Sequence, residues 1–419
     1  MTDIIQAKET APLGYHYTNA GILPNEWTSR PLSSIVEEIA ETAGTRKIET
    51  VSISAGVGFV NQAEKFGKEL SGKQYEKYTV LHCGDFSYNK GNSNLYPQGC
   101  IYRLNDRTEA AVPNVFESFR VSDGNPDFYE QLFISGFLNR QLHSRINRGV
   151  RDDGLLNLRG KDFYSCEVPC PPLAEQERIA EILMQCDKVI ELKQKRIEEE
   201  KKKKIWLYRR ILTGKTRLKG YETPWVETTI GEQVEYLVGY PFESASFLND
   251  GIKLLRGSNV KRGNLSWGTD ITAYWSEDSS ISDYLCQEGD IVIAMDGAQV
   301  GRSFSRIGNN DLPCYLVQRV ARLRSNINGL IVQWIGGSRF ARHIDQRKTS
   351  TAIPHMTIKD ILSYEISIPT DEKEIEHISQ LLNQQDQFID LLEKEMNELC
   401  NRKASLAKLL LTGIVRTKV

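Results

Sequence analysis

The sequence contains one long internal repeat, and no other feature constrains the fold as strongly. Residues 175–217 align without a gap with residues 374–416, an offset of 199 residues. Upstream the match continues after a one-residue slip, with Lys161-Asp162 over Lys359-Asp360. The identical pairs in the gap-free part include Glu177/Glu376, Ile179/Ile378, Leu183/Leu382, Asp187/Asp386, Lys195/Lys394 and Leu212-Thr213-Gly214/Leu411-Thr412-Gly413. The 419 residues therefore form two half-proteins of about 200 residues each.

Each copy of the repeat carries the apolar spacing of a coiled-coil helix. In the second copy, apolar residues follow alternating three- and four-residue steps over about five heptads, with Gln385 and Lys403 as polar members. The predicted seam is Ile375, Ile378, Leu382, Ile389, Leu392, Met396, Leu399, Leu406 and Leu410, and the first copy reads Leu183, Cys186, Ile190, Lys193, Ile197, Glu200, Lys204, Leu207 and Ile211. Proline precedes and glycine follows each stretch, as expected where a helix starts and stops. At about 1.5 Å per residue, each predicted helix is a rod of roughly 60 Å.

A charge run lies within the first of these helices, from Glu198 to Lys204. Such a run can bind nucleic acid, but glutamates followed by lysines also support one another on a solvated helix face. The sequence favours the helix-face interpretation.

The segments that precede the two helices differ from the helices and from each other. Residues 48–165 and 228–366 are rich in Gly, Asn, Ser, Tyr and Trp, with short apolar runs such as Asp290-Ile291-Val292-Ile293-Ala294. This composition predicts mixed α/β globules with many surface loops. Because the helices are alike and the globules are not, we expect one assembly role and two different ligands.

Composition excludes several classes of protein. Lys plus Arg (53) nearly equals Asp plus Glu (55), so any nucleic-acid binding must come from local patches. No apolar run of about 18 residues occurs, and residues 1–10 lack the apolar core of a signal peptide. Among eight cysteines the only close pair is Cys166 and Cys170, and no histidine stands at zinc-ligand spacing from it. These features predict a cytoplasmic protein with reduced thiols.

No enzyme motif is complete in this sequence. Gly214-Lys215-Thr216 is similar to the end of a phosphate-binding loop, but Arg209 stands where the first glycine belongs, which favours a helix cap. Gly56-Val57-Gly58 lacks the third glycine of a dinucleotide fingerprint. Asn125-Pro126-Asp127-Phe128 departs from the N-P-P-[FYW] motif of amino-methyltransferases at its third position, and a turn is favoured there. We therefore predict no catalytic residue, no cofactor and no metal site in this chain.

A basic cluster recurs just before each long helix. Two pairs of arginines obey the offset of 199 residues, Arg140 with Arg339 and Arg148 with Arg347. Arg and Lys among Asn, Gln and Ser suit contacts with DNA phosphates and base edges, and ordinary surface charge at a helix end is the alternative. The predicted DNA-binding residues of these clusters are Arg140, Arg145, Arg148 and Arg151 in the first half and Arg339, Arg342, Arg347 and Lys348 in the second.

Two polar loops bracketed by glycine are further candidates, residues 88–93 and 295–302. Asn, Gln, Lys and Arg are the side chains that read adenine and guanine edges. The predicted DNA-binding residues are therefore Lys90 and Asn92 in the first loop and Gln299 and Arg302 in the second. Sharp turns between strands are the alternative, and the sequence does not decide between the two.

In these features the sequence resembles the specificity subunit of type I restriction–modification systems, over nearly the whole chain. The motifs that carry the resemblance are Trp27 and Trp225 at the start of each target-recognition domain, the Gly-Asp steps Gly84-Asp85 and Gly289-Asp290, and the helix start from Pro171 to Glu177. The second half departs from the family's helix start at Pro369-Thr370-Asp371. The first polar loop is similar to the Tyr-Asn-Lys type of recognition domain and the second to the Met-Asp-Gly type.

The resemblance implies an α+β fold, in which two mixed α/β target-recognition domains are separated by two long antiparallel coiled-coil helices in an internal twofold repeat. The implied segments are an N-terminal segment (1–25), the first recognition domain (26–170), the central helix (171–214), the second recognition domain (215–369) and the C-terminal helix (370–419).

The resemblance also implies a role without catalysis. Each recognition domain would read one half of a split double-stranded DNA sequence, and the helices would fix the gap between the halves. The implied partners are two methyltransferase subunits, which use S-adenosylmethionine on adenine, and motor–nuclease subunits, with no membrane. Two alternatives stay open: a system with a methyltransferase alone, and a non-catalytic scaffold whose globules bind protein or RNA.

Overall fold

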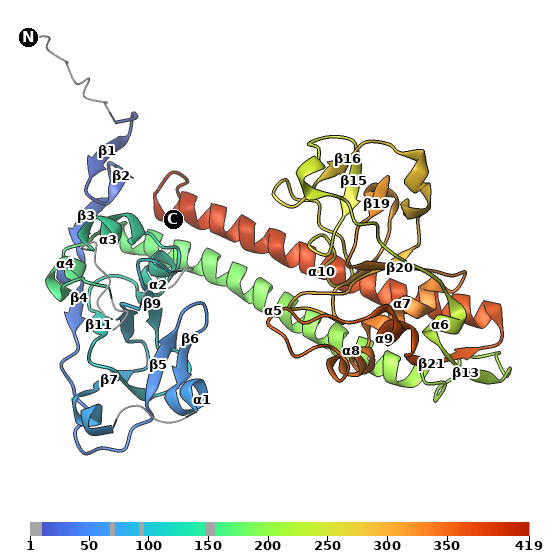
Figure 1. Ribbon diagram of the computed structural model, residues 1–419. Coiled ribbons are helices and arrows are strands. Elements are labelled where there is room, and N and C mark those ends of the chain that lie inside the picture. The colour runs from blue at the N-terminus through green and yellow to red at the C-terminus, as the bar shows by residue number, and fades with distance from the viewer. Residues whose placement is uncertain (1–10, 68–71, 92–95, 147–155, 419) are drawn as a thin grey trace, which may run out of the picture. The chain divides into compact units, whose positions relative to one another are not determined.

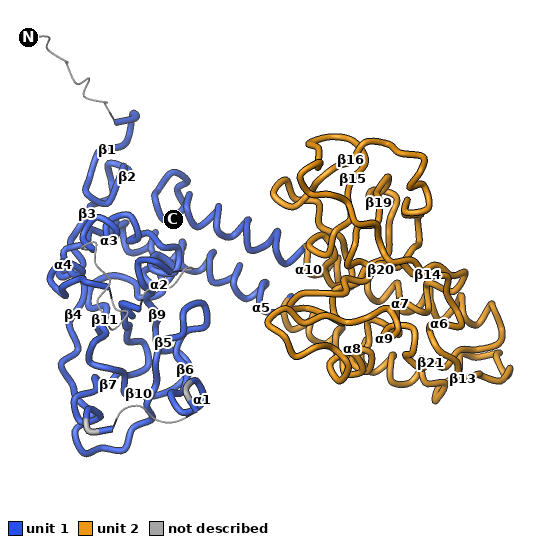
Figure 2. The backbone as a smooth tube through the Cα atoms, viewed as in Figure 1, with its two compact units in different colours: residues 1–193, 395–419 blue, residues 194–394 orange. Residues whose placement is uncertain are grey.

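The structure is a computed structural model, and it describes residues 11–67, 72–91, 96–146 and 156–418. The chain divides into two compact units, which Figure 2 colours separately. Unit 1 comprises residues 1–193 and 395–419, and unit 2 comprises residues 194–394. Each unit therefore contains one globule together with part of each long helix. The five segments expected from the sequence follow a different division and remain a prediction.

The core of unit 1 is a four-stranded antiparallel sheet in the order β4-β11-β8-β9. Phe86 and Phe119 stack on one face of this sheet with ring centroids 5.5 Å apart, and both are fully buried. Asn125, which was expected in a turn, instead caps the helix that packs near them, and Pro126 is the first residue of that helix. The strands and helices of the globule are β1 Tyr15–Thr18, β2 Gly21–Pro24, β3 Thr28–Pro31, β4 Val36–Glu38, β5 Val51–Ser54, β6 Gly58–Asn61, α1 Gln62–Phe66, β7 Thr79–His82, β8 Phe86–Asn89, β9 Cys100–Arg103, β10 Glu109–Val112, β11 Glu117–Val121, α2 Pro126–Ile134, α3 Asn139–Arg145, α4 Gly160–Tyr164 and β12 Glu167–Cys170.

Unit 2 contains a sheet of the same kind, in the order β14-β20-β17-β18, and a second sheet in the order β16-β15-β19. The run Ile291–Ala294, which the sequence marked as a short apolar strand, is β17 and is buried along its whole length. The strands and helices of this globule are β13 Trp225–Thr229, α6 Ile230–Gln233, β14 Glu235–Val238, β15 Ile252–Leu255, β16 Tyr274–Trp275, β17 Ile291–Ala294, β18 Phe304–Arg306, β19 Cys314–Leu316, β20 Val320–Arg324, α7 Asn328–Gly336, α8 Ser338–Asp345, α9 Ile358–Leu362 and β21 Glu365–Pro369.

The internal repeat extends into the globules, although their sequences differ. In unit 1 the buried carboxylate of Asp85 accepts hydrogen bonds from the guanidinium of Arg120 at 2.7 and 3.0 Å. In unit 2 the buried carboxylate of Asp290 accepts two bonds of 2.7 Å from Arg324 in the same way. Both aspartates belong to the Gly-Asp steps, so these steps anchor equivalent strands of two equivalent sheets.

Two long helices pass through both units, α5 Leu173–Ile211 and α10 Glu372–Leu411 (Figure 1). Each ends just before a glycine with positive φ, Gly214 at +65° and Gly413 at +69°, as the sequence predicted. Every residue of the two predicted seams is buried or half-buried, which confirms the coiled-coil periodicity. Within the described residues, no helix combines the length and the apolar character that a membrane span requires.

The helices run antiparallel within each unit. In unit 1 the early part of α5 lies beside the late part of α10. Asp187 forms an ion pair with Lys403, and the ammonium of Lys193 lies 2.7 Å from the carboxylate of Glu395. In unit 2 the late part of α5 lies beside the early part of α10, where Lys201 pairs with Glu393 and Lys204 with Asp386. In the charge run, Lys201 and Lys204 are held by carboxylates of α10 in this way, and Lys203 pairs with Glu200 of its own helix. The run therefore belongs to the helix pair.

Candidate nucleic-acid interface

In unit 2 several loops meet at one end of the four-stranded sheet. Strand β17 ends at Ala294, and β18 and β20 begin at Phe304 and Val320, so antiparallel pairing brings their connecting loops to the same edge. The backbone N–H of Met295 donates to the carbonyl of Arg319 at 2.9 Å, which ties loop 295–303 to the turn before β20. The predicted Met-Asp-Gly loop is thus part of a larger surface.

A third loop, residues 346–357, is fastened onto this edge. Gly297 donates its N–H to the carbonyl of Pro354 at 3.0 Å, and Met356 donates to the carbonyl of Met295 at 2.9 Å. The loop is closed on itself by Thr349, whose hydroxyl lies 2.9 Å from Nδ1 of His355. We call residues 295–303, 317–320 and 346–357 together the loop face of unit 2.

The structure brings together two of the predicted residues on this face, Arg302 and Lys348. The carboxylate of Asp345 accepts a bond of 2.6 Å from Arg302 and a bond of 2.7 Å from Lys348. These two cations, Arg302 first, hold the pKa of Asp345 well below its usual range. Gln299 lies on the same loop and is exposed. Two positive charges are therefore oriented by one carboxylate beside an amide that can reach a partner.

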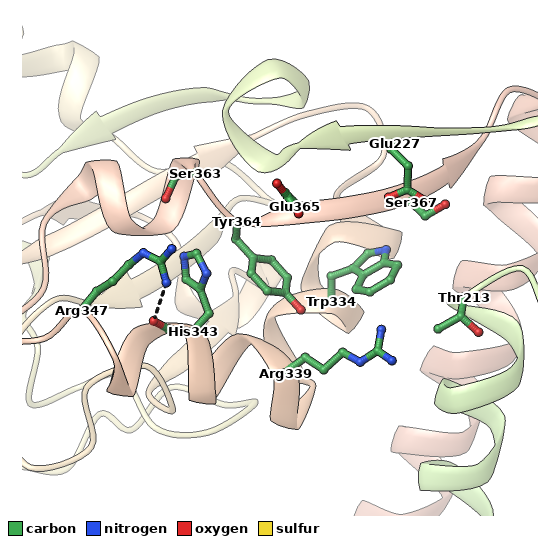
Figure 3. Close-up of a pocket in the computed structure, with 10 residues that line it drawn as sticks. All are labelled: Thr213, Glu227, Trp334, Arg339, His343, Arg347, Ser363, Tyr364, Glu365 and Ser367. Carbon is green, nitrogen blue, oxygen red and sulfur yellow. Dashed lines mark hydrogen bonds between the residues drawn. The ribbon is translucent and has the colours of Figure 1, made fainter.

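Of the other predicted residues of unit 2, Arg339 and Arg342 lie on helix α8, and Arg347 lies two residues after its end, in loop 346–357 of the loop face. Arg339, Arg342 and Arg347 are exposed, and the guanidinium of Arg342 donates to the carbonyl of Ser338 at 3.4 Å. Arg339 and Arg347 line a polar pocket of about 390 Å³ with His343 between them (Figure 3). In the figure the dashed line joins the Arg347 guanidinium to the carbonyl of His343, at 3.2 Å. The remaining lining residues are Thr213, Glu227, Trp334, Ser363, Tyr364, Glu365 and Ser367.

Unit 1 repeats the framework of this surface. Leu156 donates its N–H to the carbonyl of Lys90 at 2.9 Å, which is the counterpart of the bond from Met356 to Met295. The ammonium of Lys90 pairs with the carboxylate of Glu117, and both side chains are largely buried. The charge of Lys90 is therefore neutralised by Glu117 and largely shielded from solvent.

The basic cluster of unit 1 is only partly within the described residues. Arg140 on α3 is exposed. Arg145 on the same helix donates to the carbonyls of Gln141 and Ser165 at 3.2 and 3.4 Å. The predicted residues Asn92, Arg148 and Arg151 lie outside the described residues.

One residue that the sequence did not single out stands on the loop face, Arg319. It has φ of +70°, the only positive φ of a non-glycine residue in the described part of the chain. The left-handed region costs an ordinary residue roughly 1–2 kcal/mol. Nothing in the residue type announces this conformation, so only the folded backbone could reveal it.

Over the described ranges, no group of three or more His, Cys, Asp and Glu side chains could hold a metal ion. All eight cysteines carry free thiols, and burial raises the pKa of Cys100 and of Cys166 to about 11.

The two units thus share one framework and present different loops at the same edge of it. The model of the type I restriction modification DNA specificity domain matches residues 3–201 and again residues 215–401. The chain therefore belongs to the family of type I restriction–modification specificity subunits, whose domains recognise DNA.

Individual relatives agree with this assignment. The specificity subunit of the type I restriction enzyme MjaVIII from Methanocaldococcus jannaschii is 26% identical over 309 residues, which cover 70% of each chain. The EcoAI specificity subunit from Escherichia coli is 30% identical over 151 residues, or 34% of this chain and 26% of that one. The fold is similar to the crystal structure of the S subunit from M. genitalium, with a TM-score of 0.57 at 15% identity, covering 94% of this chain and 96% of that one.

Proposed function

We propose that the chain reads a split sequence in double-stranded DNA, with one recognition domain for each half. The carrying observation is that the two units share one framework but present different loops at the same edge of it. A shared framework supports a shared kind of ligand, and different loops support different sequences. The cations predicted from the sequence, Arg140 and Arg145 in unit 1 and Arg302, Arg339, Arg342, Arg347 and Lys348 in unit 2, would hold phosphates while loop residues such as Gln299 reach bases.

The chain would also dock partner subunits on its long helices. In unit 1, the apolar side chains of Val189 and Leu192 on α5 are 48% and 58% exposed, and neither residue belongs to the coiled-coil seam. In unit 2, Phe388 and Leu391 of α10 are 40% and 56% exposed. The two pairs are related by the offset of 199 residues, so the repeat offers the same apolar patch twice. Two like patches suit two copies of one partner, here the methyltransferase subunit, and motor–nuclease subunits would complete the complex.

The chain itself would not catalyse. Its sequence lacks a complete cofactor-binding or metal-binding motif, and methyl transfer would come from the docked subunits. Purified chain should transfer no methyl group to DNA until the methyltransferase subunit is added.

Mapping methylated adenines tests this function most directly. In a host genome, the sites methylated only when this gene is present should share one bipartite sequence with a fixed gap. Filter binding of the full chain with its methyltransferase subunits should then prefer a duplex with both halves over a duplex with either half alone. An unchanged methylation map, together with equal binding to unrelated duplexes, would contradict the proposal.

A further inference from the structure

The backbone at Arg319 adopts a conformation that the fold does not demand. Arg319 is the third residue of the four-residue turn 317–320, which Val320 closes by donating its N–H to the carbonyl of Val317 at 3.1 Å. A positive φ at this position of a turn is normally met by glycine or asparagine. Here φ is +70° with an arginine.

The first unit makes the equivalent turn without this strain. Phe116 donates its N–H to the carbonyl of Pro113 at 3.1 Å, and the third residue is Val115. Val115 lies within the described residues, and its φ is not positive. The two turns occupy the same place, because Phe116 and Val320 each lead into the strand that pairs with the Gly-Asp strand of its unit. Connecting these strands therefore does not require a left-handed residue.

The side chain of Arg319 is free to meet a ligand. It is exposed, and within the described part of the chain it has no hydrogen bond, ion pair or ring contact. Its carbonyl accepts the N–H of Met295, so its backbone is fixed against the Met-Asp-Gly loop. By contrast, the neighbouring cations Arg302 and Lys348 are already paired with Asp345. Arg319 thus has a backbone held in place by a hydrogen bond and, among the described residues, a guanidinium without a bonding partner on the loop face.

We propose that Arg319 is a specificity-determining residue that reads a guanine in the half-site of unit 2. This inference rests on the proposed function, and it adds one base contact to it. A guanidinium can donate two parallel hydrogen bonds to O6 and N7 of guanine in the major groove. Strain that the surrounding structure maintains at one residue is typical of a binding site that needs that residue in one place.

A base contact explains the strain better than a phosphate contact does. Phosphates lie all along both strands, and a flexible cation can reach them from many backbone positions. A bidentate contact to one base edge needs a fixed origin and a fixed direction. The left-handed turn supplies both.

Replacing Arg319 with glycine removes the side chain and relieves the strain in one step. Because glycine adopts positive φ readily, R319G should melt at the same temperature as the wild type or above it. Affinity of the complex for its mapped target should fall about 10- to 100-fold, the range expected for one good bidentate contact. Discrimination at one G·C pair of that half-site should disappear, while the other positions stay as selective as before.

Substituted DNA identifies the atom that Arg319 contacts. Replacing each guanine of the half-site in turn with 7-deazaguanine removes only the N7 acceptor. One such replacement should weaken binding of the wild type and leave binding of R319G unchanged. R402A serves as the matched control, because it removes an exposed arginine of α10 whose partner among the described residues is Glu398 of the same helix.

Three results would overturn the inference while leaving the proposed function intact. The first would be a half-site of unit 2 without any G·C pair. The second would be R319G binding its target as tightly as the wild type. The third would be an equal loss of affinity of R319G for all duplexes, with a shallower salt dependence. The last result would make Arg319 a phosphate contact. If the wild type shows no bipartite preference at all, the proposed function fails first.

Discussion

Buried carboxylates at the starts of the two long helices hold the ends of each unit together. Glu175 in unit 1 accepts a bond of 2.9 Å from the indole N–H of Trp27 and two bonds of 2.7 and 2.8 Å from Arg416. Glu374 in unit 2 accepts two bonds of 2.7 and 2.6 Å from Arg217. Burial alone would raise the pKa of Glu175, but the bonds from Arg416 and Trp27 hold that pKa below its ordinary value.

Replacing Arg416 with alanine should destabilise the protein at neutral pH. The change leaves the Glu175 carboxylate buried without its cation, which costs about 2–3 kcal/mol once the partial exposure of Arg416 is allowed for. The loss should appear as a lower midpoint in denaturant unfolding. R178A, which breaks the exposed pair with Glu181, should change the free energy of unfolding by less than about 0.5 kcal/mol.

The pH dependence of the same variant follows from the lowered pKa of Glu175. A carboxyl whose pKa is lower in the folded state stabilises the fold above its unfolded pKa of about 4.3, and that contribution is lost as the pH falls through the folded value. The wild type should therefore lose more stability than R416A on acidification below about pH 4.5. Parallel curves for the two proteins would show that Glu175 and Arg416 do not interact in solution.

Arg347 should contribute to affinity without contributing to sequence preference. Its guanidinium is exposed, lines the polar pocket together with Arg339, and among the described residues bonds only to the backbone carbonyl of His343, so a phosphate can approach it. R347A should weaken binding to every duplex and reduce the slope of log affinity against log salt by about 0.9. A loss confined to one base pair, at unchanged salt slope, would identify a base contact, and R178A controls for the change in net charge.

At the scale of elements, one aspartate of the repeat in each unit bonds both to the globule and to the opposite long helix. Asp187 on α5 accepts a bond of 2.9 Å from Gln131 of α2 and pairs with Lys403 of α10. Asp386 on α10 accepts a bond of 3.2 Å from Gln333 of α7 and pairs with Lys204 of α5. A polar group at a coiled-coil seam favours one register over others, so these junctions position each globule at an equivalent place on the helices.

A charge placed on the exposed apolar patches should prevent docking while leaving the fold intact. L192E and L391E each change an exposed helix position, so the free energy of unfolding should shift by less than about 0.5 kcal/mol. Each variant should retain one methyltransferase subunit, and the double variant should retain none, as measured by the mass of the purified complex. Q380E places the same charge on an exposed polar position of α10 and should bind both subunits. Full assembly of the double variant would place the docking surface elsewhere.

At the scale of the molecule, the division into two like frameworks predicts that residues 228–366 can be exchanged as one segment. Thr228 and Ile366, the proposed exchange points, lie opposite each other in the β13–β21 pair. A foreign segment would therefore enter and leave the fold at adjacent positions. The segment between them carries the loop face of unit 2, and the segment lies entirely within that unit.

Exchanging residues 228–366 for the matching segment of another type I specificity subunit should change one half of the recognised sequence. The other half should stay as it is, because no loop of unit 1 is altered. Methylation mapping of the chimera gives both halves in one measurement. A change in both halves would mean that the two recognition domains do not read independently.

The sequence by itself determined the parts of this protein that depend on local periodicity. The apolar residues of a helix seam recur every three or four positions, and proline and glycine mark the two ends of each helix. The existence of α5 and α10, and the internal repeat that relates them, could therefore be predicted from the sequence. The Gly-Asp steps and the basic clusters were also visible, because they are short and each occurs once in each half of the chain.

Only the tertiary structure decided which of the visible charges remain free. Lys90 is neutralised by Glu117, and Arg302 and Lys348 share Asp345, because strands and loops far apart in sequence meet at one sheet edge. The left-handed backbone of Arg319 was equally hidden, since an arginine in the sequence gives no sign of the φ that it adopts in the folded chain. Spacing along the chain fixes what a helix will bury, whereas long-range strand pairing fixes which polar groups find one another and which are left for a ligand.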